Sequence, residues 1–240
     1  MLSDKSIDLH DRLIFALDVP TPEEARALVE ELGDSVSFYK VGLELFMAGG
    51  YIELIDWLVR DKGKKVFADL KFFDVPQTVA SAVRNLARTG AHFATVHGND
   101  AIMEAAAREK GAMKILAVTA LTSLDRGDLD DLGFQVDVAD LVLSRARRSL
   151  ALGCDGVISS GLEAPVIRGE VGQKILIITP GVRPVQNDDD QKRTVDVAQA
   201  FENGADYIVV GRPIRDHHGF ETRKEAAESI QKTIASVFAA

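Results

Sequence analysis

Eight short apolar runs, most of them followed by a segment with helical periodicity, predict an α/β protein with the (β/α)8 barrel, or TIM barrel, fold. The chain has 240 residues, a length at which such a barrel commonly forms one domain, and no low-complexity linker divides it. We therefore expect a single barrel domain over residues 1–240. An open, doubly wound sheet is the alternative, but no G-x-G-x-x-G motif follows the first strand, which disfavours a dinucleotide-binding fold.

The first half of the barrel is expected to hold four strand and helix pairs. The first helix has a clear start, because Thr21 can cap it, Pro22 suits its first position and two glutamates follow in its first turn. Gly33 predicts its end. The strands are predicted at residues 13–18, 37–43, 65–71 and 92–96, and the other helices up to about residue 61, over 76–88 and over 101–110.

The second half repeats the pattern with longer connections. Its longest connection is expected over residues 119–136, and a polar loop over residues 180–193 follows the seventh strand. The strands are predicted at residues 114–118, 156–159, 174–178 and 207–210, and the helices over 137–150, from 163, over 195–203 and from the last strand to about residue 237.

Composition and charge exclude several classes of function. The net charge of −9 argues against a nucleic-acid or anionic-membrane surface, since both require a basic footprint. The single cysteine, Cys154, excludes an intramolecular disulfide and a multi-cysteine metal site, and we expect it in the core. No apolar run reaches the roughly 18 residues of a membrane span, and residues 1–12 lack an apolar leader segment. A soluble, cytoplasmic protein is expected.

The candidate chemistry centres on residues 68–78, which read ADLKFFDVPQT. Side chains alternate along a strand, so Asp69 and Lys71 are expected on one face at the carboxyl end of the third strand. The Val75-Pro76 pair predicts a turn and a helix start, which puts Asp74 on the connecting loop. A surface ion pair at a fraying strand is the alternative interpretation.

Polar residues also end the other predicted strands, and a (β/α)8 barrel gathers such residues at one mouth. Lys40, in the second strand, would join Asp69, Lys71 and Asp74 in an alternating array that keeps every member charged. A lysine that reaches solvent from a strand end is the alternative. The strand-end residues are Asp18, Lys40, Asp69, Lys71, His97, 119–122, 159–160, Arg183 and Arg212.

Gly211 and Arg212 follow the last strand, where (β/α)8 barrels often bind phosphate through backbone N–H groups and an arginine. The loop over residues 180–193 has the charges of a cover for such a phosphate, although a turn glycine, a surface arginine and a solvated loop would give the same pattern. Asp69 could instead hold Mg²⁺ with a second acid. Lys40 and Lys71 would repel that cation, so we expect no metal site.

Residues 69–78, DLKFFDVPQT, resemble the D-x-K-x-x-D-[IV]-P-x-T signature of the orotidine 5'-monophosphate decarboxylase family. Phe73 and Gln77 depart from the histidine and asparagine often found at those positions, and we expect little loss of function from either departure. The resemblance continues in order along the chain through FALD at 15–18, KVG at 40–42, LTS at 121–123, TPGVR at 179–183, DQKR at 190–193 and VGRPI at 210–214.

The resemblance implies a homodimeric barrel that converts orotidine 5'-monophosphate to UMP and CO₂, the last step of pyrimidine biosynthesis, without a cofactor. Lys71 would stabilise and protonate a C6 carbanion, and Asp69 would position Lys71. The implied site residues are Lys71, Asp69, Lys40 and Asp74 in the charged array, Asp18 and Lys40 on the ribose, Thr122 on the pyrimidine, Gln191 between pyrimidine and phosphate, Arg183, Gly211 and Arg212 on the phosphate, and Asp74 and Thr78 from the partner subunit.

Two alternatives stay open. One is a Mg²⁺-dependent sugar-phosphate decarboxylase or aldolase of the same superfamily, which shares the D-x-K-x-x-D motif but carries a metal-binding glutamate near the position of Lys40. The other is a barrel that binds nucleotides without catalysis.

Overall fold

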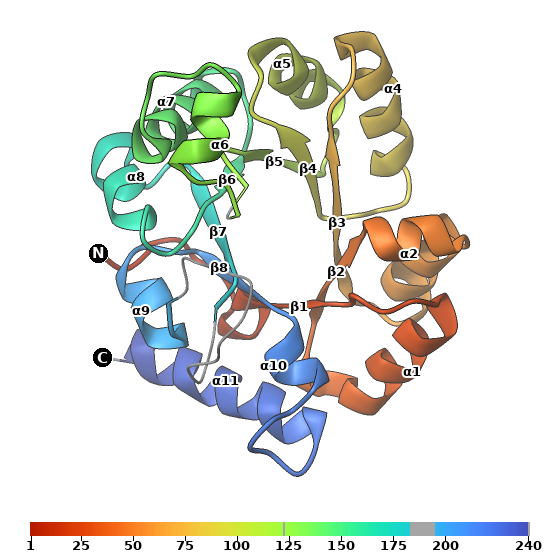
Figure 1. The fold of residues 1–240 in the computed structure, drawn as a ribbon. Helices are drawn as coiled ribbons and strands as arrows, with labels where there is room; N and C mark the ends of the chain where they lie inside the picture. Colours follow the sequence, from red (N-terminus) through yellow and green to blue (C-terminus); the bar gives the residue numbers. More distant parts are fainter. Residues whose placement is uncertain (122, 183–194, 240) are drawn as a thin grey trace.

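The computed structural model describes residues 1–121, 123–182 and 195–239, and its strands form a closed parallel barrel in sequence order, with β8 pairing to β1 (Figure 1). This confirms the (β/α)8 prediction. The strands are β1 (Leu13–Ala16), β2 (Phe38–Gly42), β3 (Lys65–Phe72), β4 (Phe93–His97), β5 (Lys114–Val118), β6 (Gly156–Ile158), β7 (Leu176–Pro180) and β8 (Tyr207–Val210).

The helices surround the barrel on its outer side (Figure 1). As predicted, Thr21 caps α1 through a bond from the backbone N–H of Glu24 to its hydroxyl, with Pro22 in the first turn. The helices are α1 (Pro22–Leu32), α2 (Leu43–Ala48), α3 (Tyr51–Asp56), α4 (Pro76–Ala87), α5 (Asp100–Glu109), α6 (Arg126–Asp131), α7 (Val138–Ala151), α8 (Ala164–Val171), α9 (Val197–Glu202), α10 (Arg212–Arg215) and α11 (Arg223–Ala239); the short turns η1 (Leu9–Arg12), η2 (Gly33–Ser35) and η3 (Trp57–Asp61) complete the described elements.

The structure corrects the sequence prediction in several connections. The helix expected up to residue 61 is broken at Gly49 and Gly50, whose φ angles of 88° and 66° lie outside the helical region. The final helix is likewise divided into α10 and α11. The long connection after β5 contains α6, which Asp125 and Asp128 start with reciprocal side-chain to backbone bonds. The seventh strand begins and ends two residues later than the predicted 174–178.

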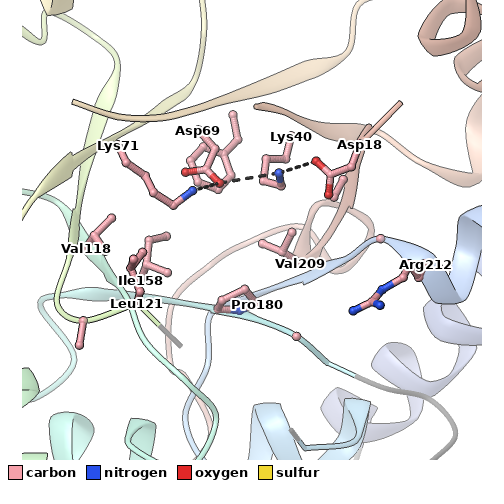
Figure 2. Close-up of a pocket in the computed structure, with 15 residues that line it drawn as sticks. Asp18, Lys40, Asp69, Lys71, Val118, Leu121, Ile158, Pro180, Val209 and Arg212 are labelled. Atoms are coloured by element: carbon pink, nitrogen blue, oxygen red, sulfur yellow. Dashed lines mark hydrogen bonds and ion pairs between the residues drawn. The ribbon is translucent and has the colours of Figure 1, made fainter. Parts of the chain in front are cut away.

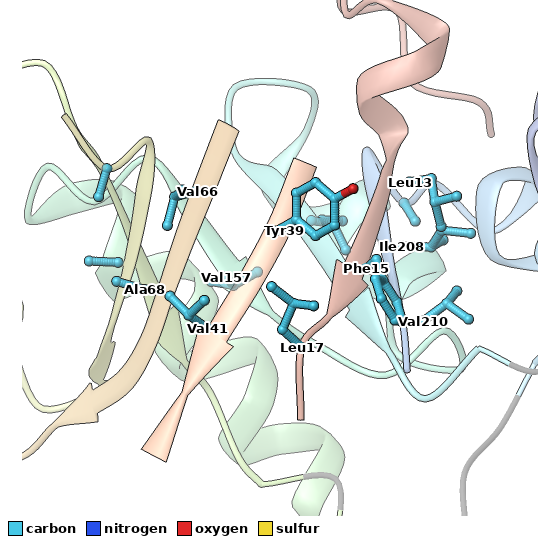
Figure 3. Close-up of a cluster of buried hydrophobic side chains, with 14 of the residues drawn as sticks. Leu13, Phe15, Leu17, Tyr39, Val41, Val66, Ala68, Val157, Ile208 and Val210 are labelled. Carbon is cyan, nitrogen blue, oxygen red and sulfur yellow. The ribbon is translucent and has the colours of Figure 1, made fainter. Parts of the chain in front are cut away.

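Two apolar layers follow from the alternation of side chains along each strand. Outward-facing residues such as Leu13, Phe15, Tyr39 and Val41 pack with the helices (Figure 3). The inward-facing set fills the barrel interior and comprises Ile14, Ala16, Phe38, Phe67, Phe93, Leu116, Val118, Ile158, Leu176, Ile178, Tyr207 and Val209. Lys40 therefore follows Phe38 on the inner face, and Asp69 follows Phe67. This places their charged groups at the carboxyl end of the interior.

A buried ion pair joins the helix of the sixth βα unit to the start of the last strand. Arg168 of α8 lies 2.8 Å from Asp206, which precedes β8, and both side chains are almost fully buried. Asp206 also accepts a 2.8 Å bond from the backbone N–H of Ile177 in β7, and Lys5 of the N-terminal segment lies 3.1 Å from the same carboxylate. The buried charges of Arg168 and Asp206 thus neutralise each other. Through Lys5, the N-terminal segment is attached at the end of the barrel opposite the carboxyl ends of the strands.

Cys154 is buried, as predicted. Among residues 1–121, 123–182 and 195–239, no helix has the length and apolar character that crossing a bilayer requires.

Candidate active site

A cavity of about 280 Å³ opens at the carboxyl ends of the strands. Figure 2 shows charged side chains from β2, β3 and the segment just after β1 along one side, apolar side chains across from them, and Arg212 at the same end of the cavity as Asp18. The lining residues are Ala16, Asp18, Lys40, Phe67, Asp69, Lys71, Val118, Ala120, Leu121, Ile158, Pro180, Gly181, Val209, Gly211 and Arg212. A polar row that faces an apolar wall suits a ligand with a charged group and a flat ring.

The charged row consists of Lys71, Asp69, Lys40 and Asp18 and alternates in sign; its first three members belong to the predicted array. Lys71 Nζ lies 2.9 Å from Oδ2 of Asp69, and Lys40 Nζ lies 3.7 Å from the same oxygen. Lys40 also donates a 2.9 Å hydrogen bond to Asp18 Oδ1. Each ammonium therefore has a carboxylate next to it, and Asp69 stands between the two lysines.

The side chain of Asp69 is the least exposed in the row, at 12%. Burial by itself raises the pKa of a carboxyl group, but the charges of Lys40 and Lys71 and hydrogen bonds from Lys71 and Thr95 outweigh it, so the pKa of Asp69 lies below its ordinary value. Asp69 is therefore ionised at neutral pH, in a setting that excludes much of the solvent.

An irregularity in β3, rather than simple strand alternation, brings Asp69 and Lys71 together. Ala68 pairs with Ala94 and Phe72 with Val96, so three residues of β3 stand opposite a single residue of β4. Lys71 has a φ of 47°, in the left-handed region that non-glycine residues seldom occupy. Such strain is typical of functional positions, where surrounding contacts hold it.

Thr95 is the β4 residue opposite this irregularity. Its hydroxyl donates a 2.8 Å bond to Asp69 Oδ1 and accepts a 2.9 Å bond from the backbone N–H of Lys71. Sequence reasoning missed this residue. The available signal was a threonine two positions after Phe93, hence on the inner face of an apolar strand.

Asp74 and Thr78 do not line the cavity of their own chain. Both are exposed: Asp74 lies on the loop after β3, as the sequence predicted, and Thr78 lies in the first turn of α4. Asp74 Oδ1 accepts a 2.6 Å bond from the backbone N–H of Val75. Phe73 beside it is 66% exposed and packs against His97 with ring centroids 4.6 Å apart. The described chain thus brings together three of the four members of the predicted array.

The predicted phosphate end is described only in part. Gly211 and Arg212 line the cavity at the junction between β8 and α10, as predicted. Thr122, Arg183 and Gln191, which the sequence also assigned to the substrate, lie outside the described residues. Within the described ranges, no three His, Cys, Asp or Glu side chains cluster closely enough to hold a metal ion.

Fold and site together define a (β/α)8-barrel enzyme whose charged groups stand at the carboxyl ends of the strands. The chain belongs to the orotidine 5'-phosphate decarboxylase / HUMPS family, whose model matches residues 11–230. It is 66% identical to the orotidine 5'-phosphate decarboxylase of Methylococcus capsulatus over 241 aligned positions, which cover 100% of this chain and 98% of the relative. It is 50% identical to the Stenotrophomonas maltophilia enzyme of the same name, over 96% of this chain and 95% of that one.

Solved structures agree with this assignment. The crystal structure of orotidine 5'-phosphate decarboxylase from Lactobacillus acidophilus matches with a TM-score of 0.83 and 35% sequence identity, covering 93% of this chain and 99% of the other. The Pyrococcus horikoshii enzyme of the same name matches with a TM-score of 0.74 and 26% identity, with the same coverage.

Proposed function

We propose that this chain decarboxylates orotidine 5'-monophosphate to UMP and CO₂, and so completes pyrimidine nucleotide biosynthesis. The observation that carries the proposal is the position of Asp69, in contact with Lys71 and close to Lys40, on the charged side of a cavity whose opposite wall is apolar. The high identity to decarboxylases over the whole chain supports the same conclusion. The Mg²⁺-dependent sugar-phosphate reading and the non-catalytic nucleotide barrel find no support among these observations.

The proposed chemistry follows from the charges. Breaking the bond between C6 of the pyrimidine and its carboxylate releases CO₂ and leaves the electron pair on C6, in an orbital that the ring cannot delocalise. The Lys71 ammonium would stabilise that charge and then transfer a proton to C6, and solvent would reprotonate the amine. Because its position is fixed before the reaction, the ammonium need not reorient, and the partly dry cavity strengthens its field.

Asp69 would hold the Lys71 side chain in place. Its 2.9 Å contact with Lys71 supports this role, and its carboxylate would also stand near the departing carboxylate of the substrate. Lys40 would hold Asp69 from the other side. Catalysis in this proposal depends on the row of charges acting together, since each ammonium is fixed by a neighbouring carboxylate.

The rest of the substrate would lie along the cavity. Asp18 and Lys40 would bind ribose hydroxyls, and Arg212 with the backbone of Gly211 would bind the phosphate; the location of all four on the cavity wall supports this orientation. Thr122 is proposed to contact the pyrimidine, Gln191 to bridge pyrimidine and phosphate, and Arg183 to contact the phosphate end. Phosphate binding far from the broken bond would supply free energy for ordering the site.

A homodimer with shared sites is part of the proposal. Asp74 and Thr78 would enter the cavity of the partner subunit, which is consistent with their exposure outside the cavity of their own chain. The neighbouring side chains Phe73 and Val75 are 66% and 62% exposed, which is a high exposure for apolar residues and suits an interface. We also propose a cytoplasmic location, since a buried free thiol needs no oxidising compartment.

The loss of orotidine 5'-monophosphate absorbance tests the proposed function directly. Chelator-treated protein is expected to turn the substrate over, and Lys71→Ala is expected to abolish turnover. Turnover that needs added Mg²⁺ would contradict the cofactor-free chemistry. An active Lys71→Ala protein would contradict the role of the lysine, and UMP binding without turnover would favour a non-catalytic barrel.

A further inference from the structure

The irregularity in β3 poses a specific structural problem. Between the paired residues Ala68 and Phe72, the backbone of β3 has three residues where β4 has one, so the regular ladder of hydrogen bonds is interrupted there. Two of these residues, Asp69 and Lys71, carry the proposed chemistry. Lys71 in addition has the left-handed φ of 47°. Contacts from outside β3 must therefore hold this geometry.

Thr95 supplies two of those contacts through one atom. Its Oγ1 accepts from the Lys71 backbone at 2.9 Å and donates to Asp69 Oδ1 at 2.8 Å. Donor and acceptor capacities of the hydroxyl are both used, and both are directed to the two residues of the irregularity. Thr95 is fully buried, so water does not compete for these bonds.

The two oxygens of Asp69 are thereby distinguished. Oδ2 faces the ammonium groups of Lys71 and Lys40, whereas Oδ1 is held by Thr95. A carboxylate held at both oxygens cannot rotate about its terminal bond without losing a contact. The same hydroxyl that fixes this rotation also fixes the backbone that carries the Lys71 side chain.

We propose that Thr95 is a positioning residue for the decarboxylation, whose hydroxyl sets the relative positions of the Asp69 carboxylate and the Lys71 ammonium. This inference rests on the proposed roles of Asp69 and Lys71. Thr95 itself does not line the cavity, so it acts through those two residues and not on the substrate. Its removal should therefore affect the chemical step much more than substrate binding.

The test compares Thr95→Val, which keeps the shape but removes the hydroxyl, with Thr95→Ser, which keeps the hydroxyl. For Thr95→Val we expect kcat to fall about 10- to 100-fold, with KM within about threefold of the parent, because small misplacements of reacting groups cost this much. For Thr95→Ser we expect kcat to recover to within about threefold of the parent.

The pH profile separates positioning from a general loss of packing. The hydrogen bond from Thr95 contributes to the lowered pKa of Asp69, so the acid limb of kcat should move to higher pH in Thr95→Val and stay in place in Thr95→Ser. A matched control is Thr179→Val. Thr179 is also a fully buried barrel threonine, but its hydroxyl has no hydrogen-bond partner among the described residues. This control should keep the parent kcat, KM and pH profile.

The outcomes distinguish this inference from the proposed function. If Thr95→Val does not fold, Thr95→Ala replaces it in the comparison with Thr95→Ser, since alanine and serine differ only in the hydroxyl. If the variant without the hydroxyl keeps the parental kcat while Lys71→Ala is inactive, the role of Thr95 is overturned and the proposed function stands. Equal loss in Thr95→Ser and Thr95→Val would overturn it as well. A fully active Lys71→Ala protein would instead overturn the proposed function on which the inference rests.

Discussion

The Nζ of Lys40 lies 3.7 Å from Oδ2 of Asp69, and both side chains are largely buried. The positive charge of Lys40 is the largest of the influences that lower the pKa of Asp69, while burial acts in the opposite direction. Lys40 therefore contributes strongly to keeping the buried carboxyl group charged, beside Lys71 and Thr95, and this gives a prediction about stability as a function of pH.

For Lys40→Met we expect the pKa of Asp69 to rise. In the parent protein the lowered pKa means that ionised Asp69 stabilises the fold above the ordinary carboxyl pKa of 3.8, and that this contribution is lost as the pH falls through the folded-state pKa. In the variant the negative charge of the buried Asp69 carboxylate has lost the neighbouring positive charge of Lys40, so the cost of burying it is offset less. Unfolding in urea should show a loss of about 1–3 kcal/mol at pH 7.5 that shrinks as the pH falls through the raised pKa of Asp69 in the variant, where the folded state takes up a proton.

The control for this experiment is Lys62→Met, which removes an ion pair to the exposed Glu30. Its cost should stay below about 1 kcal/mol because solvent screens surface pairs. A pH-independent difference between Lys40→Met and the parent would contradict the link between Lys40 and the ionisation of Asp69.

The proposed sharing of sites predicts complementation between two inactive variants. Lys71→Ala keeps Asp74, and Asp74→Ala keeps Lys71, so a mixed dimer would contain one intact site. After dissociation and random reassociation, about a quarter of the parental activity per subunit should return, since half the dimers are mixed and each has one working site. Lys71→Ala mixed with Asp69→Asn is the control and should stay inactive, because both residues come from the same side of the site. Mixed dimers without activity would refute the shared site.

Arg212 is predicted to recognise the phosphate. For Arg212→Ala we expect the inhibition constant of UMP to rise about 30- to 300-fold, the loss of a bidentate charge-assisted contact, while that of uridine changes little. Arg60→Ala removes an arginine whose side chain is 65% exposed and forms a surface ion pair with Asp56, so it should affect neither constant. An equal effect of Arg212→Ala on UMP and uridine would place the phosphate elsewhere.

Two glycines should respond in opposite directions to alanine. A Cβ at Gly156 in β6 would lie 2.7 Å from Leu116 Cδ2 and 2.9 Å from the carbonyl oxygen of Leu176, so Gly156→Ala should destabilise the barrel by about 1–3 kcal/mol. A Cβ at Gly169 in α8 would have nothing within 4 Å, so Gly169→Ala should stabilise the protein by about 0.5–1 kcal/mol. Thermal unfolding measures both, and a stable Gly156→Ala protein would contradict the tight packing of β6.

Cys154 should be unreactive in the folded protein. Burial raises the pKa of its thiol to about 12, and the nearby Asp155 adds to this, so very little thiolate is present at pH 8. The disulfide reagent DTNB should react with the thiol of the native protein far more slowly than with the thiol of free glutathione. In urea it should label the protein fully. Rapid stoichiometric labelling of the native chain would show that this part of the barrel opens readily.

The sequence by itself determined the barrel and most of the charged row. Strand alternation places Lys40 and Asp69 on the inner face after Phe38 and Phe67, because inward and outward positions have a period of two. The Val75-Pro76 pair likewise determines where α4 begins, since proline fixes the backbone there. These features depend on local geometry, which residue types encode directly.

Only the tertiary structure decided how Asp69 and Lys71 meet. Their contact depends on the irregularity in β3 and on Thr95 in the neighbouring strand, a residue that lies 24 positions after Lys71 in the chain. The break at Gly49 and Gly50 and the helix within the long connection were also missed, because several backbone paths suit the same loop composition. Register between strands is set by the packing of the whole barrel, so a sequence pattern within one strand does not contain it.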